Sequence, residues 1–193
     1  MTERPISPEE ARESLELVEA TMRQMQRAVV HAGTPYFFLI WGVVWTLGFG
    51  STQVLGPESS LVSVVWMVLD ALGAIASFVV GWRMATRLRH PLYSPTIGLF
   101  WLTWIAYAAL IIYFAQPQSS DQLSLLISLF AMFGYVVTGI FLRSRFLIGL
   151  GVALTVVIIG GYLFFLAYYN LWMAVFGGGS LIAVGLYMRY AWR

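Results

Sequence analysis

The sequence predicts an all-α, polytopic integral membrane protein in which six transmembrane helices form three hairpins, preceded by an amphipathic helix in the cytoplasm. Hydrophobic residues make up 60% of the 193-residue chain and charged residues only 10%, a balance that a soluble domain reaches only by exposing its core to water. Six apolar runs are long enough to cross a bilayer as helices of about 20 residues. The chain has 11 Lys or Arg residues, and all of them are arginines. If every run crosses the membrane, these arginines all fall on the same side of it.

Residues 1–33 are predicted to form the amphipathic helix outside the membrane. Ser7 is a favourable N-cap and Pro8 suits the first helical position. Glutamates follow in the first turn, where the helix dipole favours anions. Apolar residues then recur at alternating spacings of four and three, which is typical of a narrow seam between paired helices. The seam consists of Ala11, Leu15, Val18, Met22, Met25 and Val29.

The partner of this seam has three candidate identities. The first half of the helix carries five glutamates, which anionic lipid headgroups would repel, so pairing with protein is favoured over lying flat on the membrane. The seam can dock on the arginine-bearing loops of its own chain, mediate a homo-oligomer, or bind a separate membrane or cytoplasmic protein. Fewer than three heptads make a free-standing coiled coil marginal.

Residues 34–193 form the predicted membrane domain. Arginines occur before the first span and after each even-numbered span, the pattern of loops retained in the cytoplasm. Both termini are therefore predicted to be cytoplasmic, and without an organelle or lipidation signal the bacterial inner (cytoplasmic) membrane is the expected location. Arginines after each even-numbered span make the three hairpins look like a three-fold repeat, but the charge rule alone produces the same pattern. Whether the hairpins are a true repeat therefore stays open. The spans are roughly residues 36–55, 61–82, 93–115, 123–142, 146–167 and 171–189.

Apart from Arg189 at the last position of the sixth span, Asp70 is the only Asp, Glu, Lys, Arg or His inside a predicted span, and it lies near the middle of the second one. A charge at that depth costs about 2.5 to 3.5 kcal/mol, so the side chain is expected to be neutral or paired. Ser63, Gly73 and Ser77 share its stripe at helical spacing, which predicts that Asp70 points into the bundle. It is either a proton or cation site or a hydrogen-bonded contact between helices.

Deep aromatic residues are candidates for shaping a site around Asp70. Trp45 lies in the first span, and Trp104 and Tyr107 lie one turn apart in the third. Aromatic faces beside a membrane carboxylate can hold a lipophilic cation by cation-π attraction. The alternative is ordinary packing, since aromatic residues are abundant throughout the chain.

Small residues interrupt the second, fifth and sixth spans. Such interruptions can act as hinges at a site in mid-membrane, or they can let neighbouring helices approach closely. The candidate hinge or packing residues are Gly73, Ser77, Gly160, Gly161, Gly177, Gly178 and Gly179.

Several chemistries are excluded by composition. The chain has no cysteine for thiolate metal sites and no lysine for a retinal Schiff base. His31 and His90 lie at the cytoplasmic edge, and a lone buried aspartate cannot form an aspartyl protease pair. The acidic amino-terminal helix argues against nucleic acid. No catalytic residue, metal or cofactor is therefore assigned, and the chain is not expected to be an enzyme.

Two functions follow from these residues. The leading hypothesis is a small multi-pass transporter or channel in which Asp70 binds a proton or cation at the midplane, with Tyr107, Trp45 and Trp104 lining the site. The alternative is a non-catalytic membrane subunit, scaffold or sensor that docks a partner through its amino-terminal helix. A lipid-handling enzyme that uses Asp70 as a lone base is a third class.

Overall fold

The computed structural model describes residues 7, 9–17, 20, 34–87, 95–141 and 143–191. All regular structure within these ranges is helical, and they contain no strand. Six segments are long and apolar enough to cross a membrane. The all-α class is therefore confirmed, and these helices agree with the multi-pass organisation that the composition predicts. Hydrocarbon cannot hydrogen-bond to the backbone, so helices that satisfy their own N–H and C=O groups are the expected spanning elements.

The first five spans are α-helical throughout. The sixth begins with a 3₁₀ turn, and its α-helix is broken by six π-helical residues, although the backbone stays right-handed helical at both junctions of that segment. π-Helical segments are rare within helices and frequent at functional sites. In chain order the elements are α2 (Thr34–Leu55), α3 (Ser60–Arg87), α4 (Pro95–Ala115), α5 (Ser120–Phe141), α6 (Arg145–Phe164), η2 (Leu166–Tyr168), α7 (Tyr169–Trp172), η3 (Met173–Gly178) and α8 (Gly179–Ala191).

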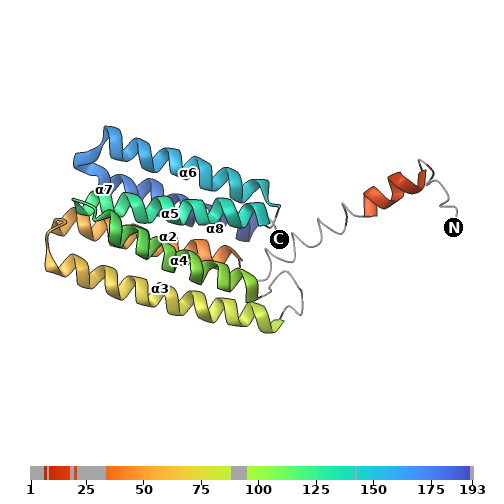
Figure 1. The fold of residues 1–193 in the computed structure, drawn as a ribbon, viewed down its shortest axis with the longest axis horizontal. Helices are drawn as coiled ribbons and strands as arrows, with labels where there is room; N and C mark the ends of the chain where they lie inside the picture. Colours follow the sequence, from red (N-terminus) through yellow and green to blue (C-terminus); the bar gives the residue numbers. More distant parts are fainter. Residues whose placement is uncertain are drawn as a thin grey trace.

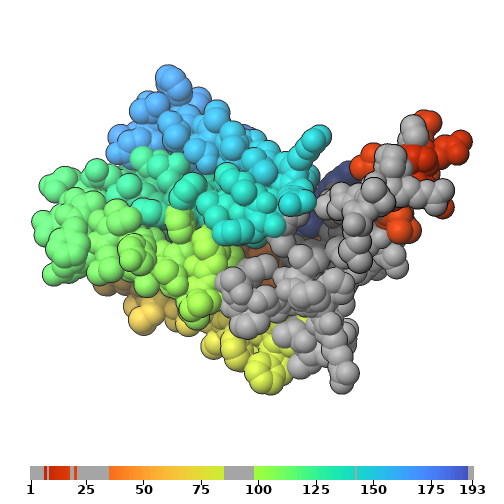
Figure 2. Space-filling view, turned by 45° about the vertical axis from the view of Figure 1, so that its right-hand side comes forward, coloured from red at the N-terminus to blue at the C-terminus, as the bar shows by residue number. Residues whose placement is uncertain are grey.

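The core lies between α2, α5, α6 and the broken sixth span, and α3 and α4 lie outside it (Figure 1). The most extensive helix contact joins α5 to α6, whereas α3 packs chiefly on α2 and α4 chiefly on α5. Figure 2 shows α4, in green, on the surface of the bundle. The contacts therefore do not confirm the arrangement as three hairpins, because the fourth and fifth spans form the tightest pair.

Two ends of the bundle differ in charge. The arginines that the structure describes in the membrane domain belong to the last turns of α3 and α8 and to the turn between α5 and α6, which lie at one end (Figure 1). The turns at residues 56–59, 116–119 and 165–168 lie at the opposite end and contain no arginine. We call these the arginine end and the arginine-free end.

Glycine lets α2 approach the sixth span at the distance of backbone contact. A Cβ atom on Gly178 would lie 2.6 Å from the Thr46 nitrogen and 2.8 Å from the Gly42 carbonyl oxygen. One turn along η3, the hydroxyl of Thr46 donates to the carbonyl of Ala174 at 3.3 Å. Small residues drive such approaches in membranes because they maximise van der Waals contact. This crossing holds the broken span against the core.

The amino-terminal helix begins as the sequence predicts. The Ser7 hydroxyl accepts from the Glu10 N–H at 3.2 Å, and the Glu10 carboxylate accepts from the Ser7 N–H at 2.9 Å, which is a complete capping box. Residues 9–17 are helical, and Leu15 of the predicted seam is 65% exposed. Val18, Met22 and Met25 lie outside the described residues, so the seam and its partner stay predictions.

We expect Gly42→Ala to destabilise the fold, because the added Cβ would lie 2.8 Å from the backbone nitrogen of Ile182 and 3.0 Å from the Gly178 carbonyl oxygen. Overpacking of this kind costs about 1 to 3 kcal/mol. Gly50→Ala on the same helix is the matched control, since its Cβ meets nothing within 4 Å. Unfolding free energies in mixed detergent micelles check the pair, and equal destabilisation of both variants would contradict the close crossing.

Candidate functional site

Asp70 lies on an exposed flank of α3. The rotation of α3 is set by Trp66, whose indole N–H donates to the Thr52 hydroxyl at 3.0 Å, and by Gly73, whose Cβ would lie 3.1 Å from Val44. Asp70 precedes Gly73 by three residues, which turns it about 60° away from the α2 contact. The prediction that Asp70 points into the bundle is therefore wrong for the single chain.

The predicted stripe around Asp70 is divided between contact and surface. Gly73 is buried against α2, and Ser77 is half-buried with a hydroxyl that has no hydrogen-bond partner among the described residues. Ser63 is exposed like Asp70. The polar residues of the stripe therefore lie along the edge of the contact between α3 and α2, and not at its centre.

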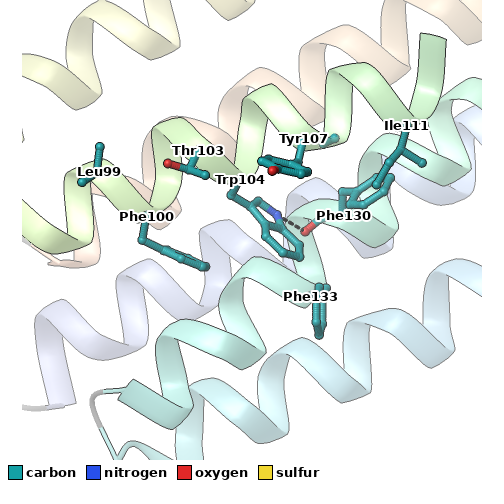
Figure 3. Close-up of a pocket in the computed structure, with 9 residues that line it drawn as sticks. Leu99, Phe100, Thr103, Trp104, Tyr107, Ile111, Phe130 and Phe133 are labelled. Atoms are coloured by element: carbon teal, nitrogen blue, oxygen red, sulfur yellow. Dashed lines mark hydrogen bonds between the residues drawn. The ribbon is translucent and has the colours of Figure 1, made fainter. Parts of the chain in front are cut away.

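The three aromatic candidates are not gathered around Asp70. Trp45 is 7% exposed in the core, where its ring packs edge-on against Phe49 at 5.8 Å between centroids. Trp104 and Tyr107 line an apolar groove of 580 Å³ between α4 and α5, and Asp70 is not among the residues that line it (Figure 3). Trp45 therefore acts in packing, and the other two lie in a separate groove.

The groove is held together by one tryptophan. The Trp104 indole N–H donates to the carbonyl oxygen of Phe130 at 3.1 Å, drawn as a dashed line in Figure 3. Its ring also packs against Phe133, with centroids 4.7 Å apart. A Cβ on Gly134 would lie 3.4 Å from the same indole nitrogen. These contacts attach α4 to α5, so Trp104 has a structural role that needs no ligand.

The predicted hinge glycines separate into two groups. Gly161 packs against the indole of Trp172, and Gly177 and Gly178 pack against α2. A Cβ added to Gly160 would meet no atom of a neighbouring element within 4 Å, and one added to Gly179 would meet only a carbonyl oxygen at 3.9 Å. With Gly73, which packs against Val44, close helix contact thus accounts for four of the six candidate glycines. The π-helical segment Met173–Gly178 includes two of them.

A polar pocket at the arginine-free end was not predicted from the sequence. Asp121 lies in the first turn of α5, whose start is capped by Ser119: its hydroxyl accepts from the Gln122 N–H at 3.1 Å. Asn170 in α7 donates from Nδ2 to the Asp121 carboxylate at 3.2 Å. The pocket has a volume of 410 Å³ and is lined by Thr52, Gln53, Pro57, Asp121, Leu166, Ala167 and Asn170.

Several buried polar atoms of α5 and α7, one of them in this pocket, lack hydrogen-bond partners among the described residues. Asn170 is only 7% exposed, and its Oδ1 has no hydrogen-bond donor among the described residues. The hydroxyls of Tyr169, which is fully buried, and of Ser128, two turns from Asp121 on α5, are also without partners there. Unsatisfied buried polar groups are rare in native proteins and call for an explanation.

Chain position alone gave a partial signal for this pocket. Asp121 and Asn170 border two of the turns that lack arginine, where polar residues are expected simply because the chain leaves the membrane. The sequence does not show that these two turns meet, because Asp121 and Asn170 are 49 residues apart. Within the described ranges, no three His, Cys, Asp or Glu side chains lie close enough to hold a metal ion.

We expect Trp104→Phe to weaken the attachment of α4 by about 0.5 to 1.5 kcal/mol, because the ring stays and the hydrogen bond to Phe130 is lost. Trp101→Phe is the matched control, since Trp101 contacts the same helix through its ring over Gly134. Limited proteolysis of the turn before α5, compared in detergent, measures release of α4. Equal protection of the Trp104 variant and the native chain would show that this bond contributes nothing.

No protein-family model matches the chain, and no curated protein or solved structure matches it significantly. The function must therefore be argued from the geometry of these sites. They are the exposed flank of α3, the apolar groove on α4 and α5, and the polar pocket at the arginine-free end.

Proposed function

We propose that this protein is a non-catalytic membrane subunit that assembles inside the bilayer with a second copy of itself through the flank of α3 that carries Asp70. The observation that supports this function is the exposure of Asp70 on a helix that packs chiefly on α2. A charge in mid-membrane costs about 2.5 to 3.5 kcal/mol, and the neutral acid is still a polar group without a partner in hydrocarbon. A protein surface covering this flank lowers both costs.

A second copy suits Asp70 by its chemistry. A protonated carboxyl group has one donor and further acceptors, so two such groups satisfy each other. A two-fold contact brings the same residue of each copy together at the same depth. The nearest basic residue along α3 is Arg83, about 20 Å away along the helix axis, which favours an acid pair over an ion pair.

The neighbours of Asp70 favour close approach. Ser63 and Ala74 are exposed on the same flank, and small residues at helix contacts let backbones come together in membranes. Ile75, Leu72 and Val68 lie further round the helix and are 61%, 58% and 48% exposed. That wholly apolar side is suited to lipid, so the flank and the lipid side of α3 are distinguishable by experiment.

The orientation and the amino-terminal helix are part of the proposal. The arginine end faces the cytoplasm of a bacterial inner membrane, with both termini on that side, because arginine-bearing loops are retained there. The amphipathic helix at residues 1–33 supplies a second contact, either within the assembly or with a cytoplasmic partner. The capping box at Ser7 and the exposure of Leu15 support a helix with an apolar side available for pairing.

The absence of cysteine from the chain makes the assembly directly testable. We expect Ala74→Cys, one turn from Asp70, to form disulfide-linked dimers in native membranes under mild oxidation. Ile75→Cys is the matched control, because it lies about 140° round the helix from Asp70 and is 61% exposed. Equal linkage at both positions would contradict a contact specific to the Asp70 flank.

Asp70 itself is tested in the Ala74→Cys background. Asp70→Leu is expected to weaken association roughly 3- to 30-fold, since interhelical hydrogen bonds in membranes contribute about 0.6 to 2 kcal/mol. Asp70→Asn is expected to retain linkage, because an amide also both donates and accepts. Unchanged linkage in Asp70→Leu would remove Asp70 from the contact, whatever the oligomeric state.

Transport is the second candidate function, and the broken sixth span supports it. Its π-helical segment is of a kind that is frequent at functional sites. If Asp70 carries a proton or cation across, Asp70→Asn should abolish flux in liposomes reconstituted with the protein, measured with a pH-sensitive dye. Full flux in that variant would exclude Asp70 as the transported-ion site.

A further inference from the structure

We propose that the polar pocket at the arginine-free end binds a small primary amine in its ammonium form. This inference is independent of assembly through α3, because the pocket is formed by other elements: the end of α2, the start of α5 and the η2–α7 turn. It rests on three properties of the pocket: unmet acceptors, a negative charge with no counter-charge among the lining residues, and partly apolar walls.

The unmet acceptors belong to Asp121 and Asn170. The Asp121 carboxylate accepts from Asn170 at 3.2 Å, and an ionised carboxylate has room for about four hydrogen bonds. The same Asn170 side chain, 7% exposed, has no donor for its Oδ1 among the described residues. A ligand that carries several N–H donors satisfies the carboxylate directly, and it reaches Oδ1, which is enclosed by protein, when the Asn170 side chain turns toward the pocket.

The rim of the pocket is already hydrogen-bonded and therefore positioned. Thr52 donates to the Gly48 carbonyl at 2.9 Å and accepts from Trp66 at 3.0 Å. Gln53 Oε1 accepts from the Leu171 N–H at 3.1 Å, which joins α2 to the start of the sixth span. Because Thr52 and Gln53 are already engaged, Asp121 and Asn170 are the groups left to bind a ligand. The bond from Leu171 to Gln53 also fixes α2 relative to the start of the sixth span.

The electrostatics of this end select a cation. The residues that line the pocket include one carboxylate and no basic side chain. The arginines described in the membrane domain lie at the other end of the bundle. Opposite charges attract strongly where the dielectric is low, and charge-assisted hydrogen bonds are roughly twice as strong as neutral ones.

The size and walls of the pocket select an organic cation. A volume of 410 Å³ exceeds what a bare ion fills, and Pro57, Leu166 and Ala167 provide apolar surface beside the acceptors. Hard metal ions prefer six or more oxygen ligands, and the described ranges hold no cluster of three acidic or histidine side chains. A primary ammonium fits better than a quaternary one, because the Asp121 carboxylate accepts hydrogen bonds that only an N–H group can donate.

The test uses the full chain in nanodiscs and isothermal titration calorimetry with n-butylammonium chloride. We expect saturable binding, and we expect Asp121→Asn to weaken it at least about tenfold. This variant keeps the shape of the side chain and an oxygen to accept from Asn170, so folding is preserved. Glu58→Gln is the matched control and should bind within about twofold of the native chain, since Glu58 lies in the turn outside the pocket.

Competing cations separate the proposal from its alternatives. Sodium chloride and tetramethylammonium chloride at matched ionic strength should displace n-butylammonium poorly. Displacement by sodium as strong as by n-butylammonium would overturn the amine assignment, and so would equal binding by Asp121→Asn. Asp70→Leu should bind n-butylammonium normally, so failure of α3 assembly and failure of this pocket give different results.

Discussion

The backbone contact between α2 and the broken sixth span organises the polar groups of this bundle. Gly42 and Gly178 allow the two helices to meet without side chains between them. The Thr46 hydroxyl donates a hydrogen bond to the Ala174 carbonyl within the π-helical segment. The Ala174 carbonyl also accepts from the Gly179 N–H within the sixth span, so α2 adds a second donor to a backbone bond that the π-helical segment already makes. The remaining helices pack around this crossing, with α5 and α6 completing the core.

The break has consequences at the arginine-free end of the molecule. Because the sixth span begins with a 3₁₀ turn and a short helix, Asn170 lies inside the bundle and next to Asp121. The polar pocket thus combines Asn170 from the irregular start of the sixth span with Asp121 from the first turn of α5.

The periphery follows a different rule. α3 and α4 each attach to one side of the core through a tryptophan that hydrogen-bonds across the interface, Trp66 to Thr52 and Trp104 to Phe130. These indoles set the rotation of their helices, and the rotation of α3 turns Asp70 outward. In a bilayer, apolar side chains gain little by facing protein instead of lipid. Polar bonds and small residues therefore decide which face of each helix is covered.

The sequence by itself determined the class of this protein, the approximate span boundaries, the one-sided arginines and the Ser7 helix start, because length, hydropathy and capping act locally. Tertiary structure alone decided which residues meet. The inward orientation predicted for Asp70 is wrong because Gly73 alone of that stripe is buried, and it holds the α2 contact together with Trp66. Asp121 and Asn170 are 49 residues apart and meet only through helix packing. A local sequence pattern cannot predict such a long-range contact.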